Sequence, residues 1–272
     1  MKDLSREFRI NSLKNKIDLG DWDPDDTSSF KESKKEGLKD VQKLRKELGN
    51  LQKVLYAEQK HKVLIILQAM DTAGKDSTID LLFEGVSPAG VRVADFKTPS
   101  EEEKAHDFLW RIHKDVPRNG EIVIFNRSHY ESVLIERVHS LVSKKVWQER
   151  YSEINDFERM LHNEGTLILK FYLNISKKEQ KERLEERQRE LKKEWKFSPN
   201  DLPERKYWKE YINAYADAIS RTSTTWAPWY VVPSDHKWFR DLIVGDAIVG
   251  HLKNLKMKYP KLDKAESLEQ IT

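Results

Sequence analysis

Five short apolar runs recur along the chain, and a helical pattern follows each of them. The runs span residues 63–68, 91–96, 121–126, 166–175 and 229–233. The segments Ile122–Phe125 and Leu167–Leu169 are apolar without a break, which is typical of strands that are buried on both faces. The sequence therefore predicts an α/β fold in which helices flank both faces of a parallel five-stranded sheet, with right-handed crossovers.

The polar segments between these runs carry apolar residues at the three- and four-residue spacing of helices. We expect helices at 76–84, 100–114, 146–163, 176–194, 203–221 and about 238–257. A longer helix is expected at 29–57, where apolar residues from Leu38 to Leu55 recur at intervals of three or four. Residues 1–28 are polar and predict an irregular N-terminal arm, which leaves 29–272 as one domain.

In a sheet of this kind, ligands bind beyond the carboxyl ends of the strands. The loop after the first run reads Ala69-Met-Asp-Thr-Ala-Gly-Lys-Asp76 and leads into a helix. A strand, a tight loop ending in Gly-Lys and a helix form a phosphate site, because backbone N–H groups and the helix N-terminus point at the anion. The residues that we expect to contact phosphate are Ala73, Gly74, Lys75, Asp76 and Ser77.

This loop departs from the usual P-loop pattern at two positions. Ala69 replaces the first glycine, and Asp76 replaces the serine or threonine that holds magnesium. An aspartate beside a phosphate is repulsive unless a metal lies between them, so Asp71 and Asp76 together predict a bound divalent cation. The alternative is that the Gly-Lys pair ends a turn and Asp76 caps the helix.

A second polar cluster, Asn126-Arg-Ser-His-Tyr-Glu131, follows the apolar run at 121–125. P-loop enzymes usually carry a metal-holding aspartate at the end of this strand. Asn126 is instead a neutral oxygen ligand and cannot act as a base. Arg127 would point into the crevice, where its planar guanidinium can hold phosphate oxygens. The alternative is a turn followed by a capped helix.

Three further residues belong to the candidate binding set: Lys97, Glu131 and Arg137. Lys97 ends the second run on the crevice side and is a candidate for the acceptor pocket, and Glu131 ends the second polar cluster. A positive charge at Arg137 could face the same crevice, although an ion pair with a nearby acid is the alternative. For His129 we expect a structural role, since the histidines show no metal-ligand spacing.

The third cluster lies at 177–209, which holds twelve Lys or Arg and eight Asp or Glu, a net charge of +4. Arg183 and Arg187 are four residues apart and therefore share a helix face. The Glu194–Pro199 segment breaks the helix and leads to another. Such a hairpin predicts a helical lid that excludes water and brings arginines to a transferring phosphoryl group. A solvated, ion-paired surface hairpin is the alternative.

Composition and charge exclude several classes of protein and of chemistry. The 272 residues include no cysteine, which excludes disulfides and thiolate chemistry and is compatible with a cytoplasmic protein. No run approaches the ~20 apolar residues of a membrane span, and the first residues lack the apolar core of a secretory signal. The net charge of +3 is too small to indicate nucleic-acid binding by itself.

Taken together, these clusters resemble the second polyphosphate kinase family, the polyphosphate:nucleotide phosphotransferases. The stretches that carry the resemblance are 70–76, Phe108-Leu-Trp-Arg111, 120–131, Trp195-Lys-Phe197, Ser223-Thr-Thr-Trp-Ala-Pro-Trp-Tyr230 and Lys237-Trp-Phe239. They occur in the family's order over roughly residues 22–260.

The resemblance implies a P-loop kinase fold similar to thymidylate kinase, with a helical lid. It implies reversible transfer of a terminal phosphoryl group between inorganic polyphosphate and a purine nucleotide, with Mg²⁺ or substituting Mn²⁺, and a homodimer or homotetramer. By position, the chain matches the family's phosphate-loop, second-strand and lid residues at Asp71, Lys75, Asp76, Asn126, Arg127, Arg183 and Arg187.

Many members of that family carry Asp and Trp at the positions of Asn126 and His129. The version found here resembles the class III subgroup, which phosphorylates both AMP and ADP, and guanine nucleotides are further candidates. Because asparagine is a weaker metal ligand than aspartate, Asp71 becomes the preferred metal carboxylate, with Asn126 as a second ligand.

We expect direct in-line transfer, since phosphoryl transfer needs mainly positioning and charge neutralisation and no nucleophile for a phosphoenzyme is evident. Three alternatives remain. The first is an ATP-dependent nucleoside or nucleotide kinase of the same fold, and the second is a non-catalytic polyanion or nucleotide sensor. The third is nucleic-acid binding through the basic hairpin, which ranks last because no recognised motif supports it.

Overall fold

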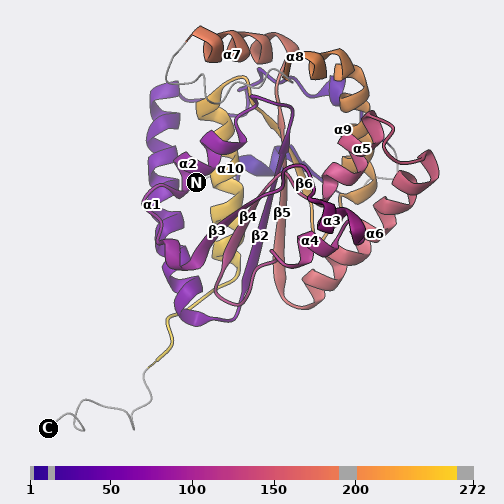
Figure 1. Cartoon of the computed structure of the whole chain (residues 1–272). Coiled ribbons are helices and arrows are strands. Elements are labelled where there is room, and N and C mark those ends of the chain that lie inside the picture. Colours follow the sequence, from indigo (N-terminus) through magenta and orange to yellow (C-terminus); the bar gives the residue numbers. More distant parts are fainter. Residues whose placement is uncertain (1–2, 12–15, 190–200, 262–272) are drawn as a thin grey trace, which may run out of the picture.

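The computed structural model describes residues 3–11, 16–189 and 201–261, and a six-stranded sheet lies at its centre (Figure 1). The strand order is β1-β6-β5-β2-β4-β3. The strands are β1 (Arg9–Ile10), β2 (Lys62–Ala69), β3 (Val91–Asp95), β4 (Ile122–Asn126), β5 (Thr166–Asn174) and β6 (Trp229–Pro233). Strands β2 to β6 are parallel, so the predicted α/β class and the five parallel strands are confirmed.

The sheet has one strand more than the sequence predicted. β1 pairs antiparallel with β6, with Arg9 opposite Tyr230 and Ile10 opposite Trp229. It belongs to the segment that was expected to be irregular, in which a 3-10 turn at Leu4–Phe8 precedes the strand. A two-residue strand is too short to produce a periodic apolar pattern, which explains why the sequence did not reveal it.

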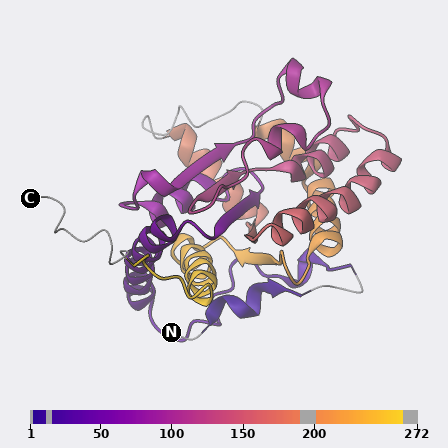
Figure 2. The same ribbon diagram turned by 90° about the horizontal axis from the view of Figure 1, so that it is seen from below.

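Helices cover both faces of the sheet, as predicted. One face carries α1 (Lys34–Glu58), α2 (Lys75–Phe83) and α10 (Lys237–Asn254), and α1 lies beside α10 in the view from below (Figure 2). The other face carries α6 (Lys144–Asn163) and α9 (Trp208–Thr222), with the short α4 (Trp110–His113) and α5 (Ile135–Val138) nearby. Apolar strands between two helical layers form the core; every residue from Ile122 to Phe125 is fully buried.

The expected helix at 100–114 is divided in two. It consists of α3 (Glu101–Ala105) and α4, because the Asp107 side chain accepts a 2.9 Å hydrogen bond from the Leu109 N–H and so favours a turn between them. In the part of the chain that the structure describes, no helix combines the length and the apolar character that a membrane crossing requires.

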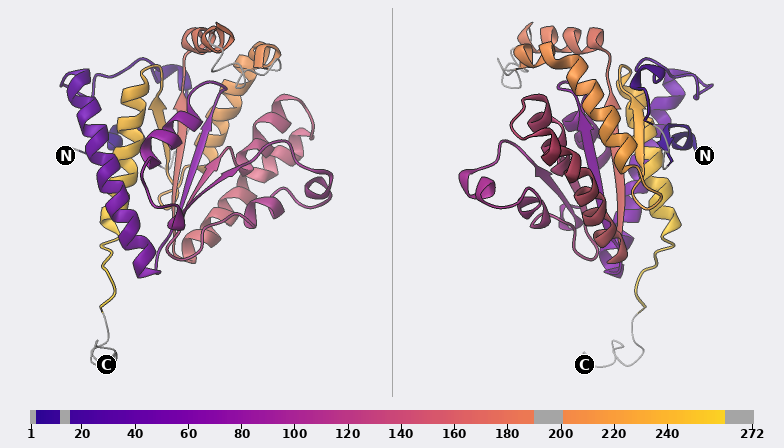
Figure 3. Two further views of the ribbon diagram at one scale, coloured as in Figure 1. Left: turned by 60° about the vertical axis from the view of Figure 1, so that its left-hand side comes forward. Right: turned by 90° about the vertical axis from the view of Figure 1, so that its right-hand side faces the viewer.

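The helices α7 (Lys177–Arg189) and α8 (Asp201–Glu204) lie beyond one end of the sheet (Figure 3). That end is the carboxyl end of the parallel strands, where α7 follows β5 directly. Residues 190–200, which include the predicted turn of the lid at Glu194–Pro199, lie outside the described residues. The described part of the predicted lid therefore lies above the strand ends where the site residues meet.

Candidate active site

A cavity of 380 Å³ opens at the carboxyl ends of β2, β3 and β4. The three strands are neighbours in register, since Leu67 of β2 and Asp95 of β3 both pair with Asn126 of β4. Ten predicted site residues line this cavity: Asp71, Gly74, Lys75, Asp76, Ser77, Lys97, Asn126, Arg127, Arg183 and Arg187. Strand order and the position of α7 thus bring together four segments that are far apart in the sequence: 71–77, 97, 126–127 and 183–187.

The loop between β2 and α2 has the backbone geometry of a phosphate cradle. Thr72 and Gly74 both have positive φ angles, 65° and 110°, and Gly74 is the N-cap of α2. The first N–H groups of α2 have no acceptor within the helix, so they are available to an anion in the cavity. Glycine suits position 74 for two reasons: residues with a side chain rarely adopt a φ of 110°, and an added Cβ would lie 1.8 Å from Nη1 of Arg240.

Lys75 is the first residue of α2 and lines the cavity. Its Nζ donates a 3.2 Å hydrogen bond to the carbonyl of Ala69, which folds the side chain back along the loop. Burial, and then the positive charge of Arg127, lower the pKa of the Lys75 ammonium, against the opposing effects of Asp71, Glu131 and Asp76. Burial is thus the main reason why this ammonium is less stable in its charged form than a free lysine, and a phosphate in the cavity would supply a compensating negative charge.

Arg127 adopts a left-handed backbone conformation, with φ of 64°, immediately after β4. Its N–H donates to the carbonyl of Leu67 at 3.1 Å, which holds this strained residue in place. The guanidinium Nη2 lies 3.4 Å from Oδ1 of Asp71. Burial lowers the pKa of Arg127, but Glu131 and Asp71 outweigh it and raise the pKa above its usual value. Arg127 is thus a permanent cation at the cavity wall.

Oxygen atoms suited to a hard cation lie beside these two positive charges. Asn126 donates from Nδ2 to Oδ1 of Asp76 at 2.7 Å, while its own Oδ1 is buried without a hydrogen-bond partner among the described residues. Asp71 lines the same cavity. Among the described residues, no group of three or more His, Cys, Asp or Glu could hold a metal ion by itself. Magnesium suits such a site, because it binds through one or two protein oxygens together with waters and substrate phosphates.

Comparisons with known proteins agree with this geometry. The model of the family Polyphosphate kinase 2 matches residues 31–260. A protein of Meiothermus ruber named AMP/ADP-polyphosphate phosphotransferase is 52% identical over 250 residues, covering 92% of this chain and 94% of its own length. An ADP-polyphosphate phosphotransferase of Rhodopseudomonas palustris is 43% identical and covers 100% of this chain and 97% of its own length.

A crystal structure of polyphosphate kinase 2 from Arthrobacter aurescens superposes with a TM-score of 0.92 at 42% identity, covering 96% of this chain and 93% of that chain. The chain belongs to the polyphosphate kinase 2 family. The family resemblance read from the motifs is therefore confirmed.

Arg183, predicted as a lid arginine of this kinase, is 6% exposed and fully engaged with protein groups. Its Nη1 donates to the carbonyls of Thr72 and Ala73, both at 3.1 Å, and its Nη2 to those of Ser234 and Asp235 at 2.7 and 2.9 Å. In this structure Arg183 joins α7 to the phosphate loop and to the segment after β6. Arg187, one turn further along α7, also lines the cavity.

Arg137 was predicted as a candidate binding residue, with an ion pair to a nearby acid as the alternative, and it is not among the residues that line the cavity. It lies on α5, where its guanidinium pairs with Asp217 of α9 at 2.8 Å and donates to the Tyr151 hydroxyl at 3.1 Å. Its guanidinium also stacks 4.2 Å from the centre of the Trp147 ring. These contacts join α5, α6 and α9. The ion pair with Asp217 is the alternative that the sequence left open.

Glu131 and Ala73 belong to the site but are not among the residues that line the cavity. Burial raises the pKa of Glu131, against the lowering effects of Arg127 and Lys75, so the carboxyl group lies close to both cations. Ala73 is fully buried and takes part through its backbone carbonyl, which accepts hydrogen bonds from Arg183 and Arg240.

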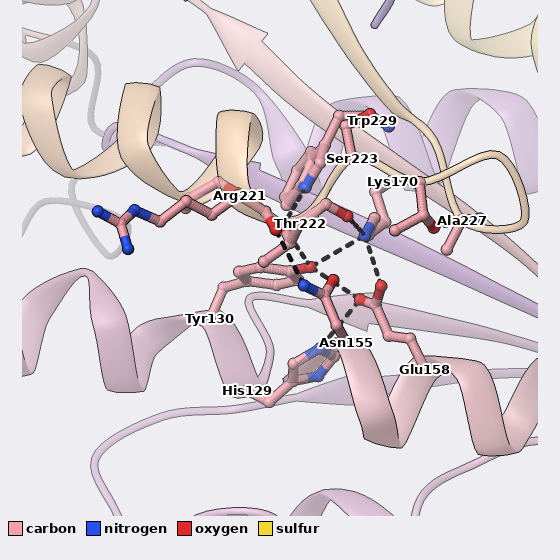
Figure 4. A network of polar contacts seen from close by, with 12 residues as sticks. His129, Tyr130, Asn155, Glu158, Lys170, Arg221, Thr222, Ser223, Ala227 and Trp229 are labelled. Atoms are coloured by element: carbon pink, nitrogen blue, oxygen red, sulfur yellow. Dashed lines mark hydrogen bonds and ion pairs between the residues drawn. The ribbon is translucent and has the colours of Figure 1, made fainter. Parts of the chain in front are cut away.

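His129 has a structural role, as expected. Its Nε2 lies 3.3 Å from Oε1 of Glu158, inside a buried network that also contains Tyr130, Lys170 and Thr222 (Figure 4). Burial lowers the pKa of His129, so the imidazole is neutral at pH 7 and donates to the carboxylate. The segment after β4 thus directs Arg127 into the cavity and His129 into the core.

Sequence reasoning missed five residues of the site: Thr72, Asp95, Glu186, Lys237 and Arg240. Asp95 and Lys237 line the cavity, at the end of β3 and the start of α10. Arg240 is 1% exposed and contacts the phosphate loop from α10. A signal was present for the last one, because adjacent Arg240 and Asp241 interrupt a helix that is otherwise largely apolar.

Proposed function

We propose that this chain transfers the terminal phosphoryl group of inorganic polyphosphate to AMP and ADP, with guanine nucleotides as further acceptors. The observation that supports the proposal is the single cavity in which the phosphate loop, Lys75, Arg127 and Arg187 meet. A kinase of this kind must hold two phosphate groups in line while neutralising the charge between them. Three cations and a row of free N–H groups around one cavity meet that need.

Lys75 and Arg127 have the direct roles in this proposal. Lys75 contacts the transferring phosphoryl group as a point charge, and Arg127 holds two of its oxygens with a planar guanidinium. Burial lowers the pKa of Lys75, and Glu131 and Asp71 raise the pKa of Arg127 against the effect of burial. Shifted pKa values are common where side chains act on a charged substrate. Charge stabilisation of this kind is strongest when water is excluded.

Asp71 and Asn126 would hold Mg²⁺, with Mn²⁺ as a substitute, and the partnerless Oδ1 of Asn126 supports that assignment. The bound ion supplies charge neutralisation between the phosphates. The acceptor needs no strong base, because the attacking oxygen of AMP or ADP belongs to a phosphate that is already ionised. Transfer is therefore direct and reversible, from the end of the polymer to the nucleotide.

The named relatives support the choice of donor and acceptor. The Meiothermus ruber protein is named for AMP and ADP together, and the Rhodopseudomonas palustris protein for ADP. We further propose that this chain forms a homodimer or homotetramer, as the family resemblance implies, and that it acts in the cytoplasm, with which the lack of cysteine is compatible. Multi-angle light scattering of the purified protein measures the oligomeric state. Fractionation of expressing cells tests the location.

The experiment is an analysis of products with AMP, ADP and GDP separately, each incubated with long-chain polyphosphate and Mg²⁺. We expect ATP from ADP, and ADP followed by ATP from AMP. Replacing polyphosphate with a nucleoside triphosphate should abolish most turnover. Turnover with the triphosphate alone would identify an ATP-dependent kinase, and binding without turnover would identify a sensor; either result would contradict the proposal.

A further inference from the structure

We propose that Arg240 is a positioning residue that holds the phosphate loop in its binding conformation from behind, an inference that rests on the proposed function. Arg240 lies on α10, on the core side of the loop, and is not among the residues that line the cavity. Its Nη1 donates to the carbonyl of Ala73 at 3.0 Å, and its Nη2 donates to Oγ of Ser77 at 3.1 Å. One guanidinium therefore contacts both the loop and the first turn of α2.

The carbonyl of Ala73 is the point that these contacts fix most firmly. It accepts from Arg240 at 3.0 Å and from Arg183 at 3.1 Å, so guanidinium groups from α10 and α7 converge on one oxygen. In a trans peptide the C=O and N–H groups point in opposite directions. Because the Ala73 carbonyl faces the two guanidinium groups, the N–H of Gly74 in the same peptide points away from them, and we infer that it faces the cavity that Gly74 lines.

The Arg240 guanidinium can pack against the phosphate loop only because position 74 has no side chain. The guanidinium occupies the space that a side chain at position 74 would need, since a Cβ there would lie 1.8 Å from Nη1. The loop is thus tightly packed against Arg240 at the residue whose N–H is presented to the ligand. A smaller or differently shaped cation at position 240 would leave this contact unfilled.

Arg240 is itself held in position by a buried acid. Its Nε donates to Oδ1 of Asp241 at 2.9 Å, and the same oxygen accepts from Oγ1 of Thr78 at 2.9 Å. Asp241 compensates the buried positive charge of Arg240. Arg240 therefore acts mainly by fixing the position of the loop, and adds little positive electrostatic potential to the cavity. Guanidinium is suited to this role, because its fixed fork of donors can reach Asp241, Ala73 and Ser77 at once, which an ammonium cannot.

The test is the Arg240→Lys variant, which keeps the charge and removes the fork. We expect the affinity for inorganic tripolyphosphate, measured by calorimetry, and kcat/KM for polyphosphate each to fall about tenfold or more, because small displacements of a binding group are costly. KM for ADP should stay within about threefold of its normal value, since Arg240 contacts the phosphate loop, the first turn of α2 and Asp241, and is not itself among the residues that line the cavity.

Asp246→Asn is the matched control. Asp246 lies on the same helix and accepts from the Ser5 N–H at 3.0 Å, away from the loop. This variant should change Tm without changing tripolyphosphate affinity. Should Arg240→Lys fail to fold, Asp241→Asn loosens Arg240 without shortening it, and the same fall in tripolyphosphate affinity is expected, smaller in size.

Unchanged tripolyphosphate affinity in a folded Arg240→Lys protein would overturn the proposal. A rise in KM for ADP as large as the fall in tripolyphosphate affinity would overturn it as well. Failure of the proposed function is distinguishable, because it would appear as an inactive unmodified enzyme. The effect of Arg240→Lys on tripolyphosphate binding would still be measurable in that case.

Discussion

Two clusters of charged side chains lie on either side of one short segment, and they are built in opposite ways. The cavity cluster, around Lys75 and Arg127, opens to solvent at the ends of three strands. The core network, around Lys170 and Glu158, is sealed, since both of these side chains are 0% exposed. Arg127 belongs to the first cluster, and His129, two residues later, belongs to the second.

The difference lies in how each charge is compensated. In the core network Lys170 has a partner for each donor: Glu158 at 2.5 Å, the carbonyl of Thr222 at 2.7 Å and the Tyr130 hydroxyl at 3.0 Å. Burial raises the pKa of Glu158, but Lys170 and His129 outweigh it and keep the carboxyl ionised. In the cavity cluster, Lys75 has one 3.2 Å bond to a carbonyl. Burial lowers the pKa of both lysines, so the two clusters differ in the number of partners of the ammonium and not in the direction of its pKa shift.

Charge that is fully paired in a dry core stabilises one conformation, whereas charge that is incompletely paired at a cavity is available to a ligand. We therefore expect substitutions in the core network to lower stability and leave turnover per folded molecule nearly unchanged. Substitutions in the cavity cluster should lower turnover per folded molecule and leave stability nearly unchanged.

The largest effect is expected from Lys170→Met, which leaves the buried carboxylate of Glu158 without its cation. Removing one partner of a buried pair typically costs about 3–5 kcal/mol, and we expect a loss of that size in the free energy of unfolding. Urea titration measures it. The double variant Lys170→Met/Glu158→Gln removes both charges and should recover most of the loss. A loss below about 1 kcal/mol in the single variant would show that the network is not a stabilising element.

The second-largest expected effect is a loss of turnover in Arg127→Gly. Loss of a charge-stabilising group should lower kcat with polyphosphate on the order of a hundredfold. The free energy of unfolding should stay the same or rise by up to about 1 kcal/mol, since glycine accepts the positive φ of this residue without strain. Arg127→Ala is the matched control, with the same loss of turnover and no gain in stability. Destabilisation by both variants would place Arg127 with the structural charges instead.

The smallest effect is a shift in a pH profile. Lys75 is active as the charged form, which is lost as pH rises through its pKa. Because burial and Arg127 lower that pKa, kcat/KM for polyphosphate should fall at a pH below the ordinary lysine value of 10.5. Lys75→Arg keeps a cation that does not titrate in this range, so its profile should lose the falling limb. An identical limb in both proteins would assign the titration to another group.

The parallel strands and the cavity follow from local patterns that the sequence displays. Apolar runs such as Ile122–Phe125 indicate buried strands, and the loop before Lys75 and the polar cluster after β4 mark the strand ends. Parallel strands place such ends at one edge of the sheet, so the meeting of Lys75 with Arg127 could be predicted.

The contacts that were missed depend on distant parts of the chain. Arg240 contacts Ala73 from 167 positions away, and Arg183 contacts Ser234 across 51. The pairing of Arg137 with Asp217 likewise depends on how α5 packs against α9. No local spacing encodes such contacts, because they depend on the packing of helices that are separate in the sequence.

The most direct test of the central claim is turnover of ADP with long-chain polyphosphate and Mg²⁺ by Lys75→Ala. Its control is Lys62→Ala, at the opposite end of β2, where Lys62 donates to the carbonyl of Glu164 at 2.8 Å. If the phosphate loop is the site of transfer, Lys75→Ala should lose on the order of a hundredfold or more in kcat at unchanged Tm, while Lys62→Ala stays near normal. Near-normal turnover by Lys75→Ala would contradict the account.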